Sequence, residues 1–211
     1  MTNEARQPLR RLAPSELDAD QRAVYDAIAG GPRATGPQRF RLTDDEGRLE
    51  GPFNAFLFQP ALGDRLQALG SAIRYATALS DRARELAILV VAAHWKSDFE
   101  QYAHEAIGRA IGVTDAELHA IRAGSDPTID ICAAPVWSDD TDRQLIGLVQ
   151  SLVRRDDLDD ETYAAAITAF GEAGLFELVT LVGYYASLAL QLRVFRVALP
   201  GEAEIGHRRD R

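Results

Sequence analysis

Apolar residues recur at intervals of three and four along most of this 211-residue sequence, and this spacing constrains the fold more than any other feature. In the stretch that begins at Pro60, for example, Leu62, Leu66, Leu69 and Ile73 fall on one face of a helix. No segment shows the strict apolar–polar alternation of a half-buried strand. The sequence therefore predicts an all-α fold of six to eight helices.

Capping residues and glycines divide the chain into its predicted helices. Ser80 is a candidate N-cap, and both Ser97 and Thr114 begin an S/T-x-x-E sequence typical of helix starts. Gly112 and Gly124 are candidate helix ends. The helices expected from these signals cover about 15–29, 60–79, 81–95, 98–111, 115–123, 141–155, 160–171 and 175–199.

A long segment without helical periodicity separates the first predicted helix from the others. Residues 32–54 contain several prolines and glycines and the turn-like sequence from Asp44 to Gly47. Loops of this length inside a compact domain are uncommon and are often functional. We expect one domain over residues 1–200, with an N-terminal extension and loop at 1–56, and a flexible tail at 201–211.

The longest apolar run extends from Leu175 to Leu192 and approaches the length that crosses a bilayer. Glu177, Gly183 and Ser187 interrupt it, so we predict a fully buried core helix instead of a membrane span. The first residues of the chain carry arginines and lack the apolar core of a signal peptide. These features predict a soluble, cytoplasmic protein.

The charge balance and the cysteine count exclude several classes of function. Thirty-two acidic residues against 23 basic ones give a formal net charge of −9. A surface this negative repels phosphate, so neither nucleic acid nor an anionic membrane is an expected partner. Cys132 is the single cysteine, which excludes an internal disulfide, a CxxC redox pair and a cysteine-based zinc site.

A dense group of polar side chains follows the nearly unbroken apolar run in the predicted helix 81–95. On a helix, Ser97, Glu100 and His104 lie within about 60° of one another and share a face. Glu100 is four residues before His104, so its carboxylate can orient the imidazole and raise its basicity. Glu85 would lie about 28 Å from His104 on one straight helix. It can join this group only if the chain reverses, as the start signal at Ser97 predicts.

The same residues allow interpretations without chemistry, and these stay open at the level of sequence. Ser97 and Glu100 match a capping box, Glu85 can form a surface ion pair with neighbouring arginines, and His104 can be a hydrogen-bonded structural histidine. Glu100 and His104 would supply two metal ligands, but no third is apparent. We therefore predict no metal and no cofactor.

The stretch DRARELAILVVAAHWKSDFEQYAHEAIGRAIGVTDAEL resembles the core motif of the carboxymuconolactone decarboxylase family, which includes the alkylhydroperoxidase D-like (AhpD-like) proteins. In the peroxidase branch, a glutamate is followed twelve residues later by CxxC and then by a histidine four residues after the second cysteine. Here Ser97, Glu100 and His104 follow Glu85 at the same spacing. The chain is thus similar to a long-form member that lacks the CxxC pair, with likeness over about residues 10–200.

The resemblance implies an AhpD-like helical bundle whose protomers assemble as trimers or hexamers around a small-molecule site. Thiol peroxidase chemistry needs a thiolate and a resolving thiol, which serine and glutamate do not supply. We therefore expect a lyase of the cofactor-independent branch, a decarboxylase of a small carboxylated lactone or a related cyclic acid. Alternatives are an isomerase, hydratase or retro-aldol lyase on another small carbonyl compound, and a non-catalytic oligomeric binding protein.

Within this resemblance, three residues are assigned to proton transfer. His104 is the expected proton donor and Glu100 the residue that orients it. Burial at the edge of an apolar segment is expected to raise the pKa of Glu85, which makes it a second acid or base.

Five further residues are assigned to substrate binding by their positions. Ser97 is placed at a helix N-terminus to bind an anionic oxygen, and Trp95 is expected to exclude water. Arg74 is a candidate partner for a substrate carboxylate. Phe53 and Asn54 belong to the GPFNAF segment, which we expect to close the pocket.

Overall fold

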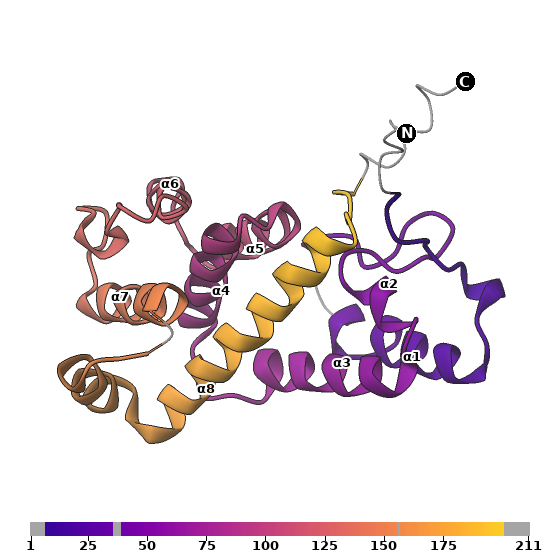
Figure 1. The fold of residues 1–211 in the computed structure, drawn as a ribbon, viewed down its shortest axis with the longest axis horizontal. Helices are drawn as coiled ribbons and strands as arrows, with labels where there is room; N and C mark the ends of the chain where they lie inside the picture. Colours follow the sequence, from indigo (N-terminus) through magenta and orange to yellow (C-terminus); the bar gives the residue numbers. More distant parts are fainter. Residues whose placement is uncertain (1–6, 36–38, 156, 201–211) are drawn as a thin grey trace, which may run out of the picture. The chain divides into compact units, whose positions relative to one another are not determined.

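The computed structural model describes residues 7–35, 39–155 and 157–200, and within them every regular element is a helix (Figure 1). The α-helices are α1 (Ala19–Ala29), α2 (Phe53–Phe56), α3 (Pro60–Tyr75), α4 (Asp81–Trp95), α5 (Asp98–Ala110), α6 (Asp115–Ala123), α7 (Asp140–Arg155) and α8 (Asp160–Val194). Three short 3-10 helices are η1 (Pro14–Glu16), η2 (Pro32–Ala34) and η3 (Ile131–Ala133). The predicted all-α class is confirmed, and the eight α-helices of the described residues agree with the expected six to eight.

Several predicted helix starts coincide with the observed caps. Ser80 Oγ accepts a hydrogen bond from the Ala83 N–H at the start of α4, and Thr114 forms a reciprocal capping box with Glu117 at the start of α6. The first helix starts later than expected, at Ala19, because Asp18 is the residue that caps it. Local side-chain chemistry therefore defines most helix starts in this chain.

The element α8 contains the two helices predicted over 160–171 and 175–199, and they meet at a kink at Gly171. Gly171 has φ 69° and ψ 174°, a conformation outside the helical region that glycine adopts without steric cost. The helical segment after this kink ends at Val194 instead of Leu199. The predicted flexible tail, 201–211, lies outside the described residues.

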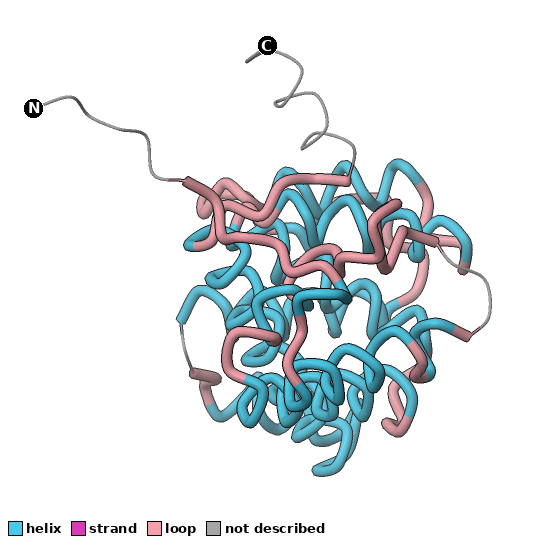
Figure 2. The backbone as a smooth tube through the Cα atoms, turned by 90° about the vertical axis from the view of Figure 1, so that its right-hand side faces the viewer, coloured by secondary structure: helices cyan, strands magenta, loops and turns pink. Residues whose placement is uncertain are grey.

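The chain divides into two compact units, each with its own internal contacts. One unit combines residues 1–71 with 190–211, and the other comprises residues 72–189. The first unit contains most of the irregular backbone, including the isolated antiparallel bridge between Thr43 and Leu49. Figure 2 distinguishes these loops from the helices that they connect.

In the second unit, α4 is the central helix and packs against α5, α6 and α7. All residues from Leu86 to Ala93 are at most 2% exposed, which explains why this run lacks a polar face. The chain then reverses at Lys96, which has a left-handed conformation (φ 50°, ψ 49°). The N–H of Ser97 bonds to the Ala92 carbonyl and closes the turn. The predicted reversal before α5 is thus confirmed.

The prediction that the long apolar helix is fully buried is wrong. Leu178 and Leu181 are completely buried, whereas Phe176 is 72% exposed and Val179 is 46% exposed. In the described part of the chain, α8 is the one helix long and apolar enough to cross a membrane, and 28% of its most apolar window is buried. The side chains of this helix are apolar on every side, so its sequence does not show which face is covered by the rest of the protein.

Candidate functional site

The reversal between α4 and α5 brings Glu85 and His104 into direct contact. Glu85 Oε2 lies 2.6 Å from His104 Nδ1 although the residues are 19 positions apart. Both side chains are buried, with Glu85 only 1% exposed. The predicted convergence of these residues is confirmed, and the alternative of a surface ion pair for Glu85 is wrong.

Glu100 completes a carboxylate–imidazole–carboxylate arrangement. Its Oε2 atom lies 3.3 Å from His104 Nε2, one helical turn along α5, so each ring nitrogen faces a carboxylate. Burial disfavours the charged imidazole, but Glu85 and Glu100 outweigh it and raise the pKa of His104 to about 9. His104 is therefore an imidazolium at neutral pH and can donate a proton.

The expected protonation of Glu85 is corrected by the structure. Burial does favour its neutral form, but the adjacent His104 and the nearby Arg74 and Arg84 hold the pKa of Glu85 below its ordinary value. Arg74 Nη1 donates a hydrogen bond to Glu85 Oε1 at 3.3 Å. The sequence indicated burial correctly, but it did not show how many cations surround the carboxylate. Glu85 is consequently an anion at neutral pH.

Tyr185 is a member of this cluster that the sequence analysis missed. Its ring packs edge-on against His104, with ring centroids 5.2 Å apart and planes at 87°. Its hydroxyl oxygen accepts a hydrogen bond from Arg74, and burial raises the pKa of Tyr185 above its ordinary value. The available signal was the Tyr184-Tyr185 pair inside an otherwise aliphatic run, because a buried phenol needs a polar partner. Tyr185 links the arginine to the imidazole.

The capping-box interpretation of Ser97 and Glu100 is wrong. Ser97 occupies the N-cap position of α5 but makes no side-chain capping bond, while the Glu100 carboxylate faces His104 instead of the helix start. Ser97 Oγ is buried and has no hydrogen-bond partner among the described residues. Trp95 is the last residue of α4, half-buried, and stacks edge-on against His94 with centroids 5.7 Å apart.

Phe53 and Asn54 belong to the other unit, where they contact the N-terminal extension and η2. Asn54 accepts a hydrogen bond from the Leu12 N–H at 2.9 Å and donates one to the Arg10 carbonyl at 2.8 Å. The Arg33 guanidinium lies 5.3 Å from the centre of the Phe53 ring. Both side chains thus stabilise the fold of their own unit, and their predicted role in closing a pocket stays a prediction.

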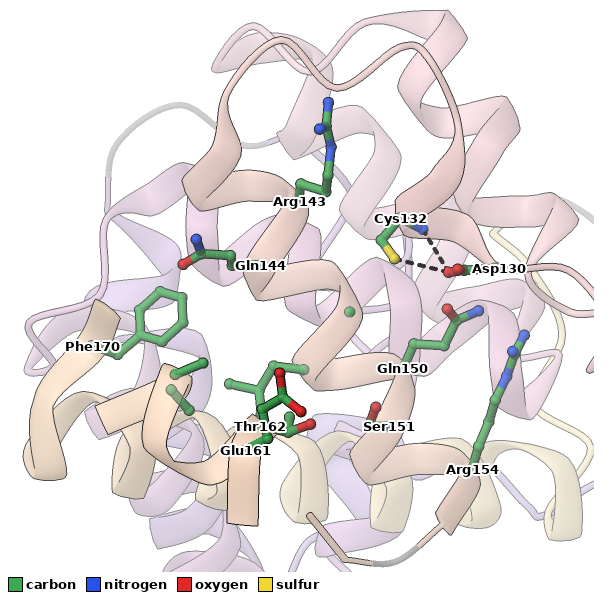
Figure 3. A pocket seen from close by; sticks show the side chains of 14 residues that line it. Asp130, Cys132, Arg143, Gln144, Gln150, Ser151, Arg154, Glu161, Thr162 and Phe170 are labelled. Carbon is green, nitrogen blue, oxygen red and sulfur yellow. Dashed lines mark hydrogen bonds between the residues drawn. The ribbon is translucent and has the colours of Figure 1, made fainter. Parts of the chain in front are cut away.

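A separate cavity of about 620 Å³ lies between α7 and the first segment of α8 (Figure 3). Its cations already have partners, since Arg143 donates to the Trp137 carbonyl at 2.7 Å and Arg154 to the Ile129 carbonyl at 2.7 Å. The Cys132 thiol donates to Asp130 at 2.9 Å, and burial and this carboxylate raise its pKa to about 11. None of the predicted site residues lines this cavity.

Within the described ranges, no three histidine, cysteine, aspartate or glutamate side chains gather in a way that could hold a metal ion. The acid/base cluster contains two carboxylates and one imidazole, and the imidazole is engaged at both nitrogens. The arrangement is suited to proton transfer.

Comparison with known proteins finds one family model that matches part of the chain. Residues 60–136 match the model of the carboxymuconolactone decarboxylase family, and this segment contains Arg74, Glu85, Ser97, Glu100 and His104. No curated protein matches the chain.

Two solved structures share the fold. One is a protein of unknown function from Agrobacterium tumefaciens, described as an antioxidant defence protein AhpD, with a TM-score of 0.60 and 16% identity over 72% of this chain and 99% of that one. The other is the debrominase Bmp8, as a cysteine-to-alanine variant in complex with 2,3,4-tribromopyrrole, with a TM-score of 0.63 and 12% identity over 95% and 94% of the two chains. Identities this low establish the fold alone.

Proposed function

We propose that this protein is a cofactor-independent acid/base enzyme that decarboxylates a small carboxylated lactone or a related cyclic acid, an activity supported by the match of residues 60–136 to the carboxymuconolactone decarboxylase family model. The observation that carries the proposal is the position of His104 between Glu85 and Glu100, at 2.6 and 3.3 Å. The debrominase of similar fold, solved with 2,3,4-tribromopyrrole, is an enzyme with a small-molecule ligand, and this supports a small-molecule reaction here.

The reaction requires one proton and no redox step. The bond between the ring carbon and the carboxylate breaks, CO₂ leaves, and the electron pair passes into the conjugated lactone to give a dienolate. The His104 imidazolium then donates its proton to a carbon of the dienolate and becomes neutral imidazole. Solvent returns the proton to the imidazole before the next turnover, and the elevated pKa of His104 keeps this step favourable at neutral pH.

The surrounding residues prepare His104 for this step. Glu85 accepts a hydrogen bond from Nδ1, which leaves the proton on Nε2 as the one available for transfer. Glu100 faces Nε2 and relays or orients that proton. Arg74 stabilises the ionised form of Glu85, so a substrate carboxylate bound by Arg74 would share the guanidinium with this glutamate.

The decisive test measures turnover of a panel of carboxylated lactones and β-keto acids by the wild type, His104→Ala and Glu100→Gln. We expect His104→Ala to lower kcat by at least about 100-fold, the lower limit of general acid catalysis. His119→Ala is the matched control, because His119 is an exposed histidine on α6 that bonds only to the Asp115 carbonyl.

Three outcomes would count against the proposal. Absence of turnover on the whole panel would remove decarboxylation as the reaction, and equal activity of His104→Ala and wild type would remove His104 as the acid. Robust turnover of a hydroperoxide with a dithiol would contradict proton-transfer chemistry altogether. Circular dichroism of each variant separates a loss of activity from a loss of folding.

The exposed apolar residues of α8 support assembly with further copies of the chain. Phe176 and Val179 of the second unit are 72% and 46% exposed and lie one helical turn apart, and Leu190 and Val194 of the first unit are 49% and 40% exposed and also lie one turn apart. Exposed apolar residues of this kind are typical of an interface between subunits. A trimer or hexamer covers them, and sedimentation as a monomer at micromolar concentration would contradict this assembly.

A further inference from the structure

The Ser97 hydroxyl is the one buried side-chain polar atom without a hydrogen-bond partner in the part of the chain that the structure describes. Ser97 as a whole is only 6% exposed. A buried hydroxyl without a hydrogen-bond partner destabilises a fold, because it loses its bonds to water and gains none in the protein. Native proteins retain such groups mostly where a water or a ligand completes the bonding, or where the group has a chemical role.

The position of this hydroxyl sets it apart from the other capping residues. Asp18, Ser80 and Thr114 each accept a hydrogen bond from the first turn of the helix that they precede, whereas Ser97 does not. The first N–H groups of a helix have no partner within the helix, and α5 extends over 13 residues. The start of α5 therefore combines a buried hydroxyl with backbone donors that lack a side-chain cap.

The charges around this helix start are compatible with an added anion. Arg74 and the His104 imidazolium balance Glu85 and Glu100, which are the two buried carboxylates of the cluster. Asp98, the other acidic residue in the first turn of α5, is exposed to water. The helix dipole favours a negative group at this end, and more strongly where solvent is excluded.

We infer that Ser97 and the N-terminus of α5 form a subsite for one delocalised anionic oxygen of the substrate. The inference deepens the proposed function, because an enolate oxygen develops when CO₂ leaves and needs preorganised donors. His104 is located on the same face of α5, two turns or about 10 Å further along the helix axis, so one cyclic substrate would have to extend from the subsite to the proton donor. The substrate class is then a cyclic acid whose decarboxylation product is an enolate.

The test measures binding without turnover. The probe is 4-nitrophenolate, a planar delocalised oxyanion that mimics an enolate, and its binding is followed by the shift of its absorbance. Acetate, followed by its displacement of the phenolate, distinguishes an enolate subsite from a carboxylate subsite. We expect Ser97→Ala to weaken phenolate binding by about tenfold or more, the loss typical of one hydrogen bond to a charged group.

Ser80→Ala is the matched control, because it removes a serine that does cap its helix. It is expected to lower the Tm and leave phenolate binding unchanged, whereas Ser97→Ala leaves the Tm unchanged or raises it. Equal phenolate affinity of Ser97→Ala and wild type, or no phenolate binding by wild type, overturns the subsite. A lowered Tm with unchanged binding assigns Ser97 a structural role and also overturns it.

Failure of the subsite and failure of the proposed function give different results. If the wild type binds phenolate through Ser97 but turns over no acid on the panel, the subsite is supported and the proposed decarboxylase activity is contradicted. If the wild type turns over an acid and Ser97→Ala has the same kcat and KM, the proposed enzymatic activity is supported and the subsite is contradicted. Tighter binding of acetate than of phenolate overturns the assignment to an enolate oxygen.

Discussion

The acid/base cluster on α4 and α5 and the cavity beside α7 show two different uses of charged side chains in the same unit. In the cavity, Arg143 and Arg154 donate to backbone carbonyls, so their charges stabilise the chain around them. In the cluster, His104 and Glu85 are charged groups in contact with each other and excluded from water. The cavity beside α7 is therefore not the place where buried charged side chains contact one another, and such contact is typical of sites of proton transfer.

His104 in the cluster and Cys132 in the cavity both have raised pKa values, but the consequences for their chemistry differ. Carboxylates raise the pKa of His104 to about 9, which keeps a proton on the imidazole and makes it a donor. Burial and a carboxylate raise the pKa of Cys132 to about 11, which keeps a proton on the thiol and makes it a poor nucleophile. Neighbouring carboxylates thus keep His104 protonated as an acid, and they keep the Cys132 thiol protonated and therefore weakly nucleophilic.

The largest effect on stability is expected from Glu85→Gln. This change removes the carboxylate that contacts both Arg74 and His104 and leaves the imidazolium with Glu100 alone, and breaking one partner of a buried ion pair destabilises by about 3–5 kcal/mol. Urea unfolding of the variant and the wild type measures it. Asp130→Asn in the cavity is the control, and an equal loss in both variants would contradict the special coupling of the cluster.

A second effect, up to a few kcal/mol, is expected from pH. Because the folded pKa of His104 is raised from 6.5 to about 9, its contribution to stability is fully present below pH 6.5 and is lost as the pH rises through about 9. The free energy of unfolding should fall over this interval in the wild type and stay flatter in His104→Gln. Parallel pH profiles in the two proteins would show that the histidine is not coupled to its carboxylates.

The sequence predicted the parts of the site that depend on local signals. The reversal before α5 follows from start signals and helical spacing, so the meeting of Glu85 with His104 was foreseeable. The ionisation of Glu85 was not, because it depends on the charge of His104 and on Arg74, which comes from a different helix. The burial of α8 was not either, since a helix that is apolar all round gives no sign of which face is covered.

Tyr185 was not predicted from local signals either. The variant Tyr185→Phe measures how much the link between Arg74 and His104 contributes to stability. The variant retains the ring that packs against the imidazole and removes only the hydroxyl that bonds to Arg74. A loss of about 1–2 kcal/mol in stability is expected, because the arginine loses a buried acceptor. NMR titration of His104 is the second readout, and an unchanged titration with unchanged stability would show that Tyr185 acts by packing alone.

The smallest effect is expected from Cys132→Ser. This variant tests directly whether the reaction depends on the cavity beside α7 or on the acid/base cluster. The thiol lies on η3, donates to Asp130 and stays protonated at neutral pH, so a hydroxyl of similar size can take over its hydrogen bond. Stability should change by less than about 1 kcal/mol and turnover on the acid panel should be unchanged. Loss of turnover in Cys132→Ser with an intact fold would move the chemistry from the imidazole between its two carboxylates to the thiol in the cavity. The buried charge pair, and not the accessible hollow, carries the reaction only if this variant remains fully active.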